Sequence, residues 1–308
     1  MISREEFPEL WRTDGWASSA VSRQDAIIEA VLRELGNRFE YYDARDYRAR
    51  MPIRICTLRD VTYGIRFNLL PGGEYRMGLS PGEQEQLQRI DRNRSWERVG
   101  IALSAMLPPH RVRVPPLLCA RFPLLETEAS NIIDLDDIEG RPEFGDFDAP
   151  VPLYLTLDEA GRVQEKTGFR LLSEAEWEYA CRAGSTSLFY FGDTIPDGDL
   201  GKTICLTDFS DDARNERASN GFGLVGLATG EFCRDSWHNS HEGAPNDGTP
   251  RSGTSSVRVV RGGAAAVWPW QDSGEWLLLL SAMRVRSDHM PEGMAGVRLA
   301  VGVGEWEG

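Results

Sequence analysis

The chain has 308 residues, of which 41% are hydrophobic and 27% are charged, the balance of an ordinary globular protein. Its formal net charge of −14 disfavours binding to nucleic acid and to anionic membrane surfaces, because both would repel it. No stretch approaches the roughly 18 apolar residues of a membrane span. The first residues also lack the pattern of a signal peptide. We therefore expect a cytoplasmic protein whose partner is a protein or a small molecule.

The five cysteines are widely spaced and include no Cys-x-x-Cys pair, which argues against a zinc site of the usual spacing. We expect reduced thiols that are mostly buried. They are Cys56, Cys119, Cys181, Cys205 and Cys233.

Residues 1–61 contain one clear amphipathic helix. Ser22 is a suitable N-cap, Gly36 can close the helix, and apolar residues recur at helical spacing at Ile27, Val31 and Leu35. A segment of this length with one helix buries too little surface to fold alone. We therefore expect 1–61 to be a helical extension that packs on the body, and the tyrosines that follow the helix suggest that it docks a partner.

The body, 62–308, begins with alternating apolar residues over 61–67, which predict a strand. Residues 71–73 read as a turn, and 74–77 as a second strand. Ser80 and Glu83 predict a capped helix through Ile90, and 110–114 alternates again as a strand.

Two further helices are predicted by capping boxes. Thr156 and Glu159 begin a helix that runs to Gly168, and Ser173 and Glu176 begin another that ends at Gly184. The acidic stretch 131–150 lacks the spacing of an EF-hand and is interpreted as a solvated surface loop. The remainder, 185–308, is rich in Gly, Asp, Asn and Trp and indicates long loops with short strands.

One motif is long enough to suggest a family. Residues 170–180 read R-L-L-S-E-A-E-W-E-Y-A, which is very similar to the R-L-P-T-E-A-E-W-E-Y-A signature of the formylglycine-generating-enzyme (sulfatase-modifying-factor) family. Other motifs similar to those of the family stand in the family's order along the chain. They lie at 70–78 (L-P-G-G-E-Y-R-M-G), 110–116 (H-R-V-R-V-P-P), 259–263 (V-V-R-G-G), 281–284 (S-A-M-R) and 296–300 (G-V-R-L-A).

The resemblance covers about 63–303 and implies an α+β fold. This fold is the family's variant of the C-type lectin fold, which is loop-rich, with short strands and few helices. The N-terminal helical extension lies outside the resemblance.

Catalytic members of the family, as the resemblance implies, bind copper(I) with two cysteines between the R-G-G strand and the closing G-F-R-L-A. Residues 261–300 contain no cysteine. A second branch holds non-haem iron with histidines of an N-terminal domain, whereas the first histidine here is His110. We therefore expect no oxidase chemistry and no cofactor, with Ca²⁺ as the one candidate ion.

Glu231 is the candidate calcium ligand, because it matches an acid of the family's calcium segment. The preceding Asp or Asn is missing, and calcium needs six to eight oxygens. His238 and His241, close to Asp235, invite a catalytic or metal interpretation, but a surface loop is favoured because further ligands are not evident.

The segment 264–295 corresponds to the family's functional groove, and we expect it to bind the ligand. Three of its tryptophans fall within nine residues, and Trp and Arg are enriched at binding hot spots. Packing in a small core is the alternative for each Trp. The candidate ligand-binding residues are Trp237, Val267, Trp268, Trp270, Gln271, Asp272, Trp276, Arg284, Arg286 and His289.

These features favour a non-catalytic binding protein, similar to the variable proteins of diversity-generating retroelements, in which this C-terminal segment is mutated in bulk. Two alternatives remain open. One is an enzyme of altered chemistry in the same groove that uses His238, His241 or Arg284. The other is a structural adaptor that docks through 1–61.

Overall fold

The structure is a computed structural model that describes residues 2–48, 51–92, 94–98, 102–138, 150–194, 204, 209–210, 212–263 and 275–304. Its main sheet has six strands in the order β1-β2-β3-β6-β11-β7, and each neighbouring pair is antiparallel. The strands are β1 (Phe39–Arg48), β2 (Pro52–Asp60), β3 (Arg66–Leu70), β6 (Leu117–Ala120), β11 (Leu299–Gly302) and β7 (Arg170–Leu171).

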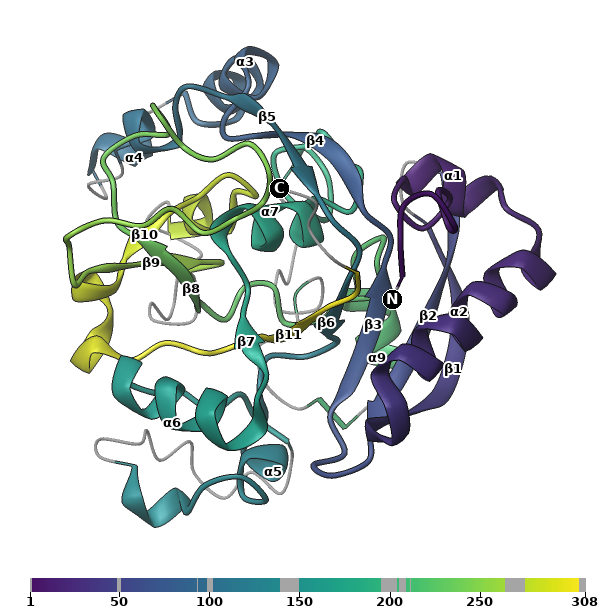
Figure 1. Cartoon of the computed structure of the whole chain (residues 1–308). Coiled ribbons are helices and arrows are strands. Elements are labelled where there is room, and N and C mark those ends of the chain that lie inside the picture. Colours follow the sequence, from purple (N-terminus) through teal and green to yellow (C-terminus); the bar gives the residue numbers. More distant parts are fainter. Residues whose placement is uncertain are drawn as a thin grey trace.

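Two smaller sheets lie beside the main sheet (Figure 1). One pairs β4 (Gly73–Met77) with β5 (His110–Val114). Both strands were predicted, at 74–77 and 110–114. The other has the order β10-β9-β8, formed by β10 (Val285–Arg286), β9 (Arg258–Arg261) and β8 (Glu231–Ser236). The result is the predicted α+β fold with short strands and extensive loops.

The longer helices are α2 (Val21–Leu35), α3 (Pro81–Ile90), α6 (Leu157–Thr167) and α7 (Glu174–Arg182). Short helices are α1 (Thr13–Ser18), α4 (Ser95–Arg98), α5 (Glu126–Ala129) and α9 (Asp212–Ala218), with 3-10 turns at Gly36–Arg38, Leu103–Met106, Leu135–Asp137, Glu275–Leu279, Ser287–His289 and Pro291–Gly293. The predicted capping boxes at the starts of α3, α6 and α7 are confirmed.

Three predicted boundaries differ from the structure. Helix α2 begins at Val21, and Ala20 precedes it without a side-chain cap, so Ser22 is not the N-cap. Helix α7 ends at Arg182, and the residue that closes it is Ala183, which adopts the left-handed conformation with φ of 46°, instead of Gly184. The strand expected over 61–67 starts only at Arg66, because the Asp60 carboxylate accepts the Tyr63 N–H at 2.7 Å and forms a turn.

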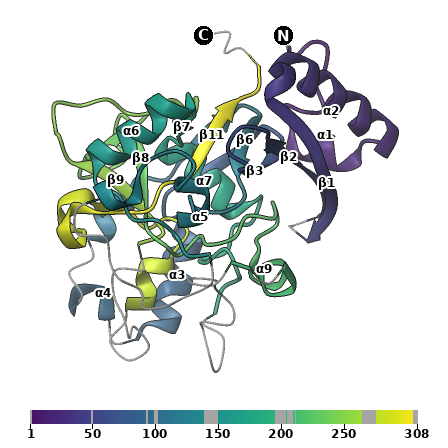
Figure 2. The same cartoon turned by 90° about the horizontal axis from the view of Figure 1, so that it is seen from below.

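The N-terminal extension contains the predicted helix and also two strands, β1 and β2, that the sequence did not predict. Strand β2 pairs with β3 of the body, and a buried hydrogen bond of 3.0 Å joins Thr57 to Asn68 across them. Seen from below, α1, α2 and the β1–β2 hairpin form a layer at one edge of the molecule (Figure 2). The extension is therefore the edge of the main sheet.

The hydrophobic core is continuous between the extension and the body. Trp16, Ile27 and Val31 of the extension belong to the same buried cluster as Phe67 and Leu299 of the sheet. The indole N–H of Trp16 donates to the Arg54 carbonyl at 2.7 Å, which fixes α1 on β2. Within the described residues, no helix combines the length and the apolar character needed to cross a bilayer.

We predict that a chain of residues 62–308 does not fold stably without the extension. Its removal would leave the backbone of β3 without its partner β2 and would expose part of the core, and unpaired edges of this kind aggregate. In thermal unfolding followed by circular dichroism, the intact chain should show one cooperative transition. The 62–308 fragment should be insoluble or lack that transition, and adding 1–61 in trans should partly restore it. A soluble fragment with an unchanged melting temperature would contradict this prediction.

Candidate functional site

Helix α7 lies inside the body and contacts β4, β5, β8 and β9. All nine of its residues are buried. Glu174, Glu178 and Arg182 recur every four residues, so their side chains lie along one side of the helix. Helix α7 thus places these two carboxylates and this guanidinium in the interior, where each of them needs a partner.

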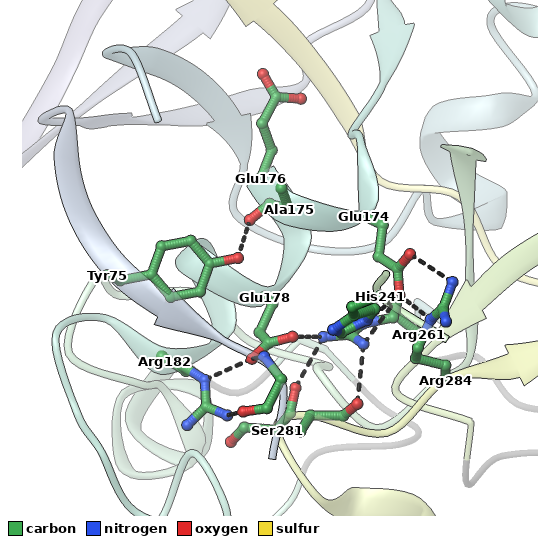
Figure 3. A network of polar contacts seen from close by, with 12 residues as sticks. Tyr75, Glu174, Ala175, Glu176, Glu178, Arg182, His241, Arg261, Ser281 and Arg284 are labelled. Atoms are coloured by element: carbon green, nitrogen blue, oxygen red, sulfur yellow. Dashed lines mark hydrogen bonds and ion pairs between the residues drawn. The ribbon is translucent and has the colours of Figure 1, made fainter. Parts of the chain in front are cut away.

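The partners of these carboxylates come from the small sheet. Arg261 at the end of β9 donates to Glu174 at 3.2 Å and to Glu178 at 2.5 Å. Arg284, just before β10, grips both oxygens of Glu174 at 2.5 and 2.9 Å, and Arg182 donates to Glu178 at 2.8 Å. Figure 3 shows these residues converging in one network of ion pairs.

The network keeps its carboxylates ionised. Burial by itself would raise the pKa of Glu174, but Arg284, His241 and Arg261 outweigh it and hold that pKa well below its usual value. Burial likewise opposes ionisation of Glu178, and Arg182 and Arg261 lower its pKa below the usual value. The buried charges therefore balance each other, which is the condition for tolerating them in a core.

The same arginines hold both ends of the connection between β9 and β10. Arg261 donates to the backbone carbonyls of Ser281 and Ala282, each at 3.0 Å, so the start of the connection is tied to its end. Gly262 has φ of +70°, and a Cβ there would lie 2.4 Å from the Leu227 carbonyl oxygen. Only glycine fits at this close approach. The 262–284 connection is anchored at its base.

The predicted ligand residues separate into several groups. Val267, Trp268, Trp270, Gln271 and Asp272 lie outside the described residues.

Trp237, Arg284 and Arg286 are brought together, because the two guanidiniums lie 4.8 and 5.9 Å from the Trp237 ring centroid. Arg284 is nevertheless buried and bound to Glu174, so this arrangement leaves it structural, whereas Arg286 is partly exposed and pairs with Asp288 at 2.6 Å.

Trp276 and His289 lie in different surroundings. Trp276 packs edge-on against Phe189, with ring centroids 5.9 Å apart, beside a second hydrophobic cluster. His289 is exposed at the end of the turn that follows β10. His289 is thus exposed and Arg286 is partly exposed, whereas Trp276 is partly buried against the second hydrophobic cluster.

Glu231, the candidate calcium ligand, is fully buried and already paired. Arg298 donates to its two oxygens at 2.6 and 3.0 Å, and the Trp177 indole donates to it at 2.7 Å. Both oxygens of the Glu231 carboxylate are thus engaged, and the carboxylate acts as the ion-pair partner of Arg298. Among the described residues, no three His, Cys, Asp or Glu side chains are grouped to hold a metal ion.

His241 is buried, which makes the surface-loop interpretation wrong for this residue. Its Nε2 lies 3.8 Å from Glu174, and neither ring nitrogen has a hydrogen-bond partner among the described residues. Gly78 permits this position, because a Cβ there would come 2.9 Å from the ring. His238 is half-buried, and its Nε2 lies 3.2 Å from the Ser252 carbonyl oxygen.

A small cavity adjoins His241, and its lining includes Glu174, Asp235 and Arg251. Asp235 accepts the backbone N–H groups of Glu174 and Arg251, each at 2.7 Å. Burial and the charge of Glu174 raise the pKa of Asp235 to about 7. A buried acid titrating near neutrality beside a histidine is a pattern common at functional sites. The sequence showed only that these residues are neighbours in a polar loop.

The described thiols do not fit a copper(I) site. Cys56, Cys119, Cys181 and Cys233 are buried on four different elements, β2, β6, α7 and β8, and none forms a disulfide. Burial raises the pKa of Cys56, Cys119 and Cys181 to about 12 and that of Cys233 well above its usual value. Soft metals bind the thiolate form, which these environments suppress. Cys205 lies outside the described residues.

Comparison with known proteins agrees with the motifs. The model of the sulfatase-modifying factor enzyme 1-like domain matches residues 65–302. The chain belongs to this family.

Among solved structures, PvdO from Pseudomonas aeruginosa is similar at 23% identity, with a TM-score of 0.56, over 80% of this chain and 97% of PvdO. Treponema denticola variable protein 1 is similar at 16% identity, with a TM-score of 0.53, over 87% of this chain and 100% of that protein. At these identities the likeness shows the fold. No curated protein matches the sequence.

For this sulfatase-modifying-factor-like domain we predict that Arg284 stabilises the fold much more than Arg286 does. Arg284→Ala leaves a buried carboxylate short of its partner and should cost about 3–5 kcal/mol of unfolding free energy. Arg286→Ala is the matched control, because it removes a partly exposed pair worth less than about 1 kcal/mol. Urea unfolding of both variants measures the difference. Equal losses would show that Glu174 does not depend on Arg284.

We also predict that Asp235 makes the domain less stable as the pH rises. Its raised pKa means that the folded chain binds the proton more tightly than the unfolded chain, so the unfolding free energy falls between about pH 4 and 7. Asp235→Asn removes this decline. It also adds a pH-independent cost, because the amide nitrogen cannot accept a backbone N–H. Urea unfolding at pH 5 and pH 8 tests the prediction, and an equal pH difference in wild type and variant would refute it.

Proposed function

We propose that the chain is a non-catalytic binding protein whose ligand surface is the segment 264–295. The observation that carries this proposal is the anchored base of the 262–284 connection. Arg261 ties the connection's end to its start, and Arg284 fastens it to α7 through Glu174. Loops that are held by a rigid scaffold are the usual place for ligand contacts, because their residues can change without unfolding the domain.

The composition of the segment supports a protein or small-molecule ligand. Trp268, Trp270 and Trp276 fall within nine residues, and the exposed His289 and partly exposed Arg286 follow beyond the connection. Aromatic rings and guanidiniums supply large contact areas with directional polar groups, which is why they dominate binding hot spots.

The absence of oxidase chemistry is supported by the sequence of the groove. Residues 261–300 contain no cysteine, although the family resemblance implies that the copper(I) enzymes need two there. With no thiolate pair available in this segment, the groove is left with side chains suited to contact.

We further propose that the segment is variable, as in the variable proteins of diversity-generating retroelements. The shared fold of Treponema denticola variable protein 1 supports this idea. An anchored connection is also the arrangement that tolerates many substitutions. A reverse-transcriptase gene with a near-copy of codons 262–300 beside this gene would support the proposal, and a neighbourhood without one would argue against it.

Two alternatives each have one observation in their favour. The buried His241 beside Glu174 and Asp235 favours an enzyme of altered chemistry at the small cavity. A structural adaptor is favoured by the extension, because the large exposed hydrophobic side chains of the described residues all lie within 1–61. They are Val21, Tyr41, Tyr42, Met51 and Val61.

We predict that the five positions Val267, Trp268, Trp270, Gln271 and Asp272 tolerate substitution without loss of the fold. Changing all five to Ser should alter the unfolding free energy by no more than about 0.5 kcal/mol per position, as surface substitutions do. A display library randomised at these codons should then yield folded clones that are enriched against a chosen protein target. Thermal unfolding and the displayed fraction are the measurements.

The matched control is randomisation of five buried α7 positions, which should abolish display. If the 267–272 library also fails to display, the segment belongs to the core and the ligand surface has been placed wrongly. Turnover of a cysteine peptide by the copper(I)-treated wild-type chain would overturn the non-catalytic assignment.

A further inference from the structure

A second cleft lies between the N-terminal extension and the body, on elements that the 264–295 segment does not include. It encloses about 780 Å³, within the range of small-molecule sites. One wall is α1 with the residues before it, and the other is formed by β4, β5 and the end of α7. Its lining includes Arg4, Trp11, Arg12, Thr13, Tyr75 and Arg113.

The walls of the cleft are fixed to each other by hydrogen bonds. The Thr13 and Tyr179 hydroxyls lie 2.8 Å apart, and the Gly72 N–H donates to the Leu10 carbonyl at 2.8 Å. Gly73 allows the close contact, because a Cβ there would lie 2.8 Å from the Thr13 hydroxyl oxygen. The cleft is therefore preformed, and binding a ligand would cost little conformational entropy.

The charge of the cleft differs from that of the chain. Its two acids are already paired, Asp14 with Arg12 at 2.6 Å and Glu74 with Arg111 at 3.3 Å. Within the described parts of the chain, Arg4 and Arg113 form no ion pair. On a chain with a net charge of −14, two unpaired guanidiniums at one cleft select an anionic group.

Aromatic side chains supply the rest of the surface. Tyr75 and Tyr179 lie with ring centroids 5.6 Å apart. Their hydroxyls are engaged, since Tyr75 donates to the Ala175 carbonyl at 2.7 Å and Tyr179 to the Pro71 carbonyl at 2.7 Å. Tyr179 is buried, whereas Tyr75 and Trp11 are partly exposed. The rings of Tyr75 and Trp11 leave a ligand flat apolar surface, which suits an aromatic ring.

We propose that this cleft binds a small aromatic anion, with Arg4 and Arg113 holding its carboxylate or phosphate and the aromatic side chains contacting its ring. The proposal does not depend on the 264–295 segment. If that segment proved to be part of the core, the cleft could still bind the anion. If the cleft proved not to bind an anion, the proposed ligand surface at 264–295 would be unaffected.

Phenyl phosphate and benzoate are suitable probes for isothermal titration calorimetry on the intact chain. Both should bind, and inorganic phosphate, which lacks a ring, should bind at least tenfold more weakly than phenyl phosphate. The double variant Arg4→Ala/Arg113→Ala should lose at least tenfold in affinity for phenyl phosphate. Both side chains are exposed, so the fold should survive.

The matched control is Arg33→Ala/Arg76→Ala, which removes two exposed positive charges outside the cleft lining and leaves the Glu74–Arg111 pair intact. It should bind phenyl phosphate nearly as well as wild type. A second variant, Met51→Glu, places a negative charge in the cleft lining and should weaken binding as well. The proposal is overturned if phenyl phosphate does not bind at millimolar concentration. Equal losses in the two double variants, or equal binding of phenyl phosphate and inorganic phosphate, would also overturn it.

Discussion

The pairing of buried charges around α7 is the constraint on which the rest of this structure depends. Glu174 and Glu178 are removed from water, and an unpaired carboxylate there would cost several kcal/mol, a large share of a domain's stability. Arg261 and Arg284 must therefore reach them from the small sheet, although they lie 83 to 110 positions further along the chain. The helix, the end of β9 and the residue before β10 must lie together for these four charges to pair. We regard the network as a device for conformational specificity more than for stability, since buried ion pairs often contribute little net free energy.

This constraint fixes the two ends of the 262–284 connection on the buried helix α7. The two arginines act at the ends of the 262–284 connection, where Arg261 holds the carbonyls of Ser281 and Ala282 and Arg284 holds Glu174. The extension adds to the frame at the opposite end of the sheet order, where β1 and β2 continue the strands of the body. The cleft beneath α1 exists because the extension is bound so closely to β4 and α7. We propose that this frame offers two binding surfaces, the tryptophan-containing segment 264–295 and the arginine-containing cleft beside α1.

Local signals in the sequence predicted the local structure well. Each capping box is a contact over three residues, so Ser80, Thr156 and Ser173 could be interpreted without knowing the fold. Strands β1 and β2 were missed because the charged residues of β1 hide its alternation, and its place in the sheet is decided by pairing with β2. We expected Arg284 to contact the ligand, because its actual partner, the Glu174 carboxylate, lies 110 positions away and could not be recognised from the sequence. His241 was expected on the surface for the same kind of reason: its polar neighbours are visible in sequence, and the close approach at Gly78 is not.

The network also explains why a strong family signature can occur in a chain that has no cysteine in residues 261–300. Glu174 and Glu178 of the E-A-E-W-E-Y-A motif bind Arg261, Arg284 and Arg182, and Glu176 binds Arg170. Trp177 donates to Glu231, which in turn binds Arg298 of the closing G-V-R-L-A strand. Every one of these motif residues is engaged in holding the frame together. The motifs therefore indicate the fold, and one fold can carry unrelated activities. The chemistry of a member must reside in what the frame holds, and in this chain the residues it holds between Gly263 and Gly296 include tryptophans and arginines but no cysteine.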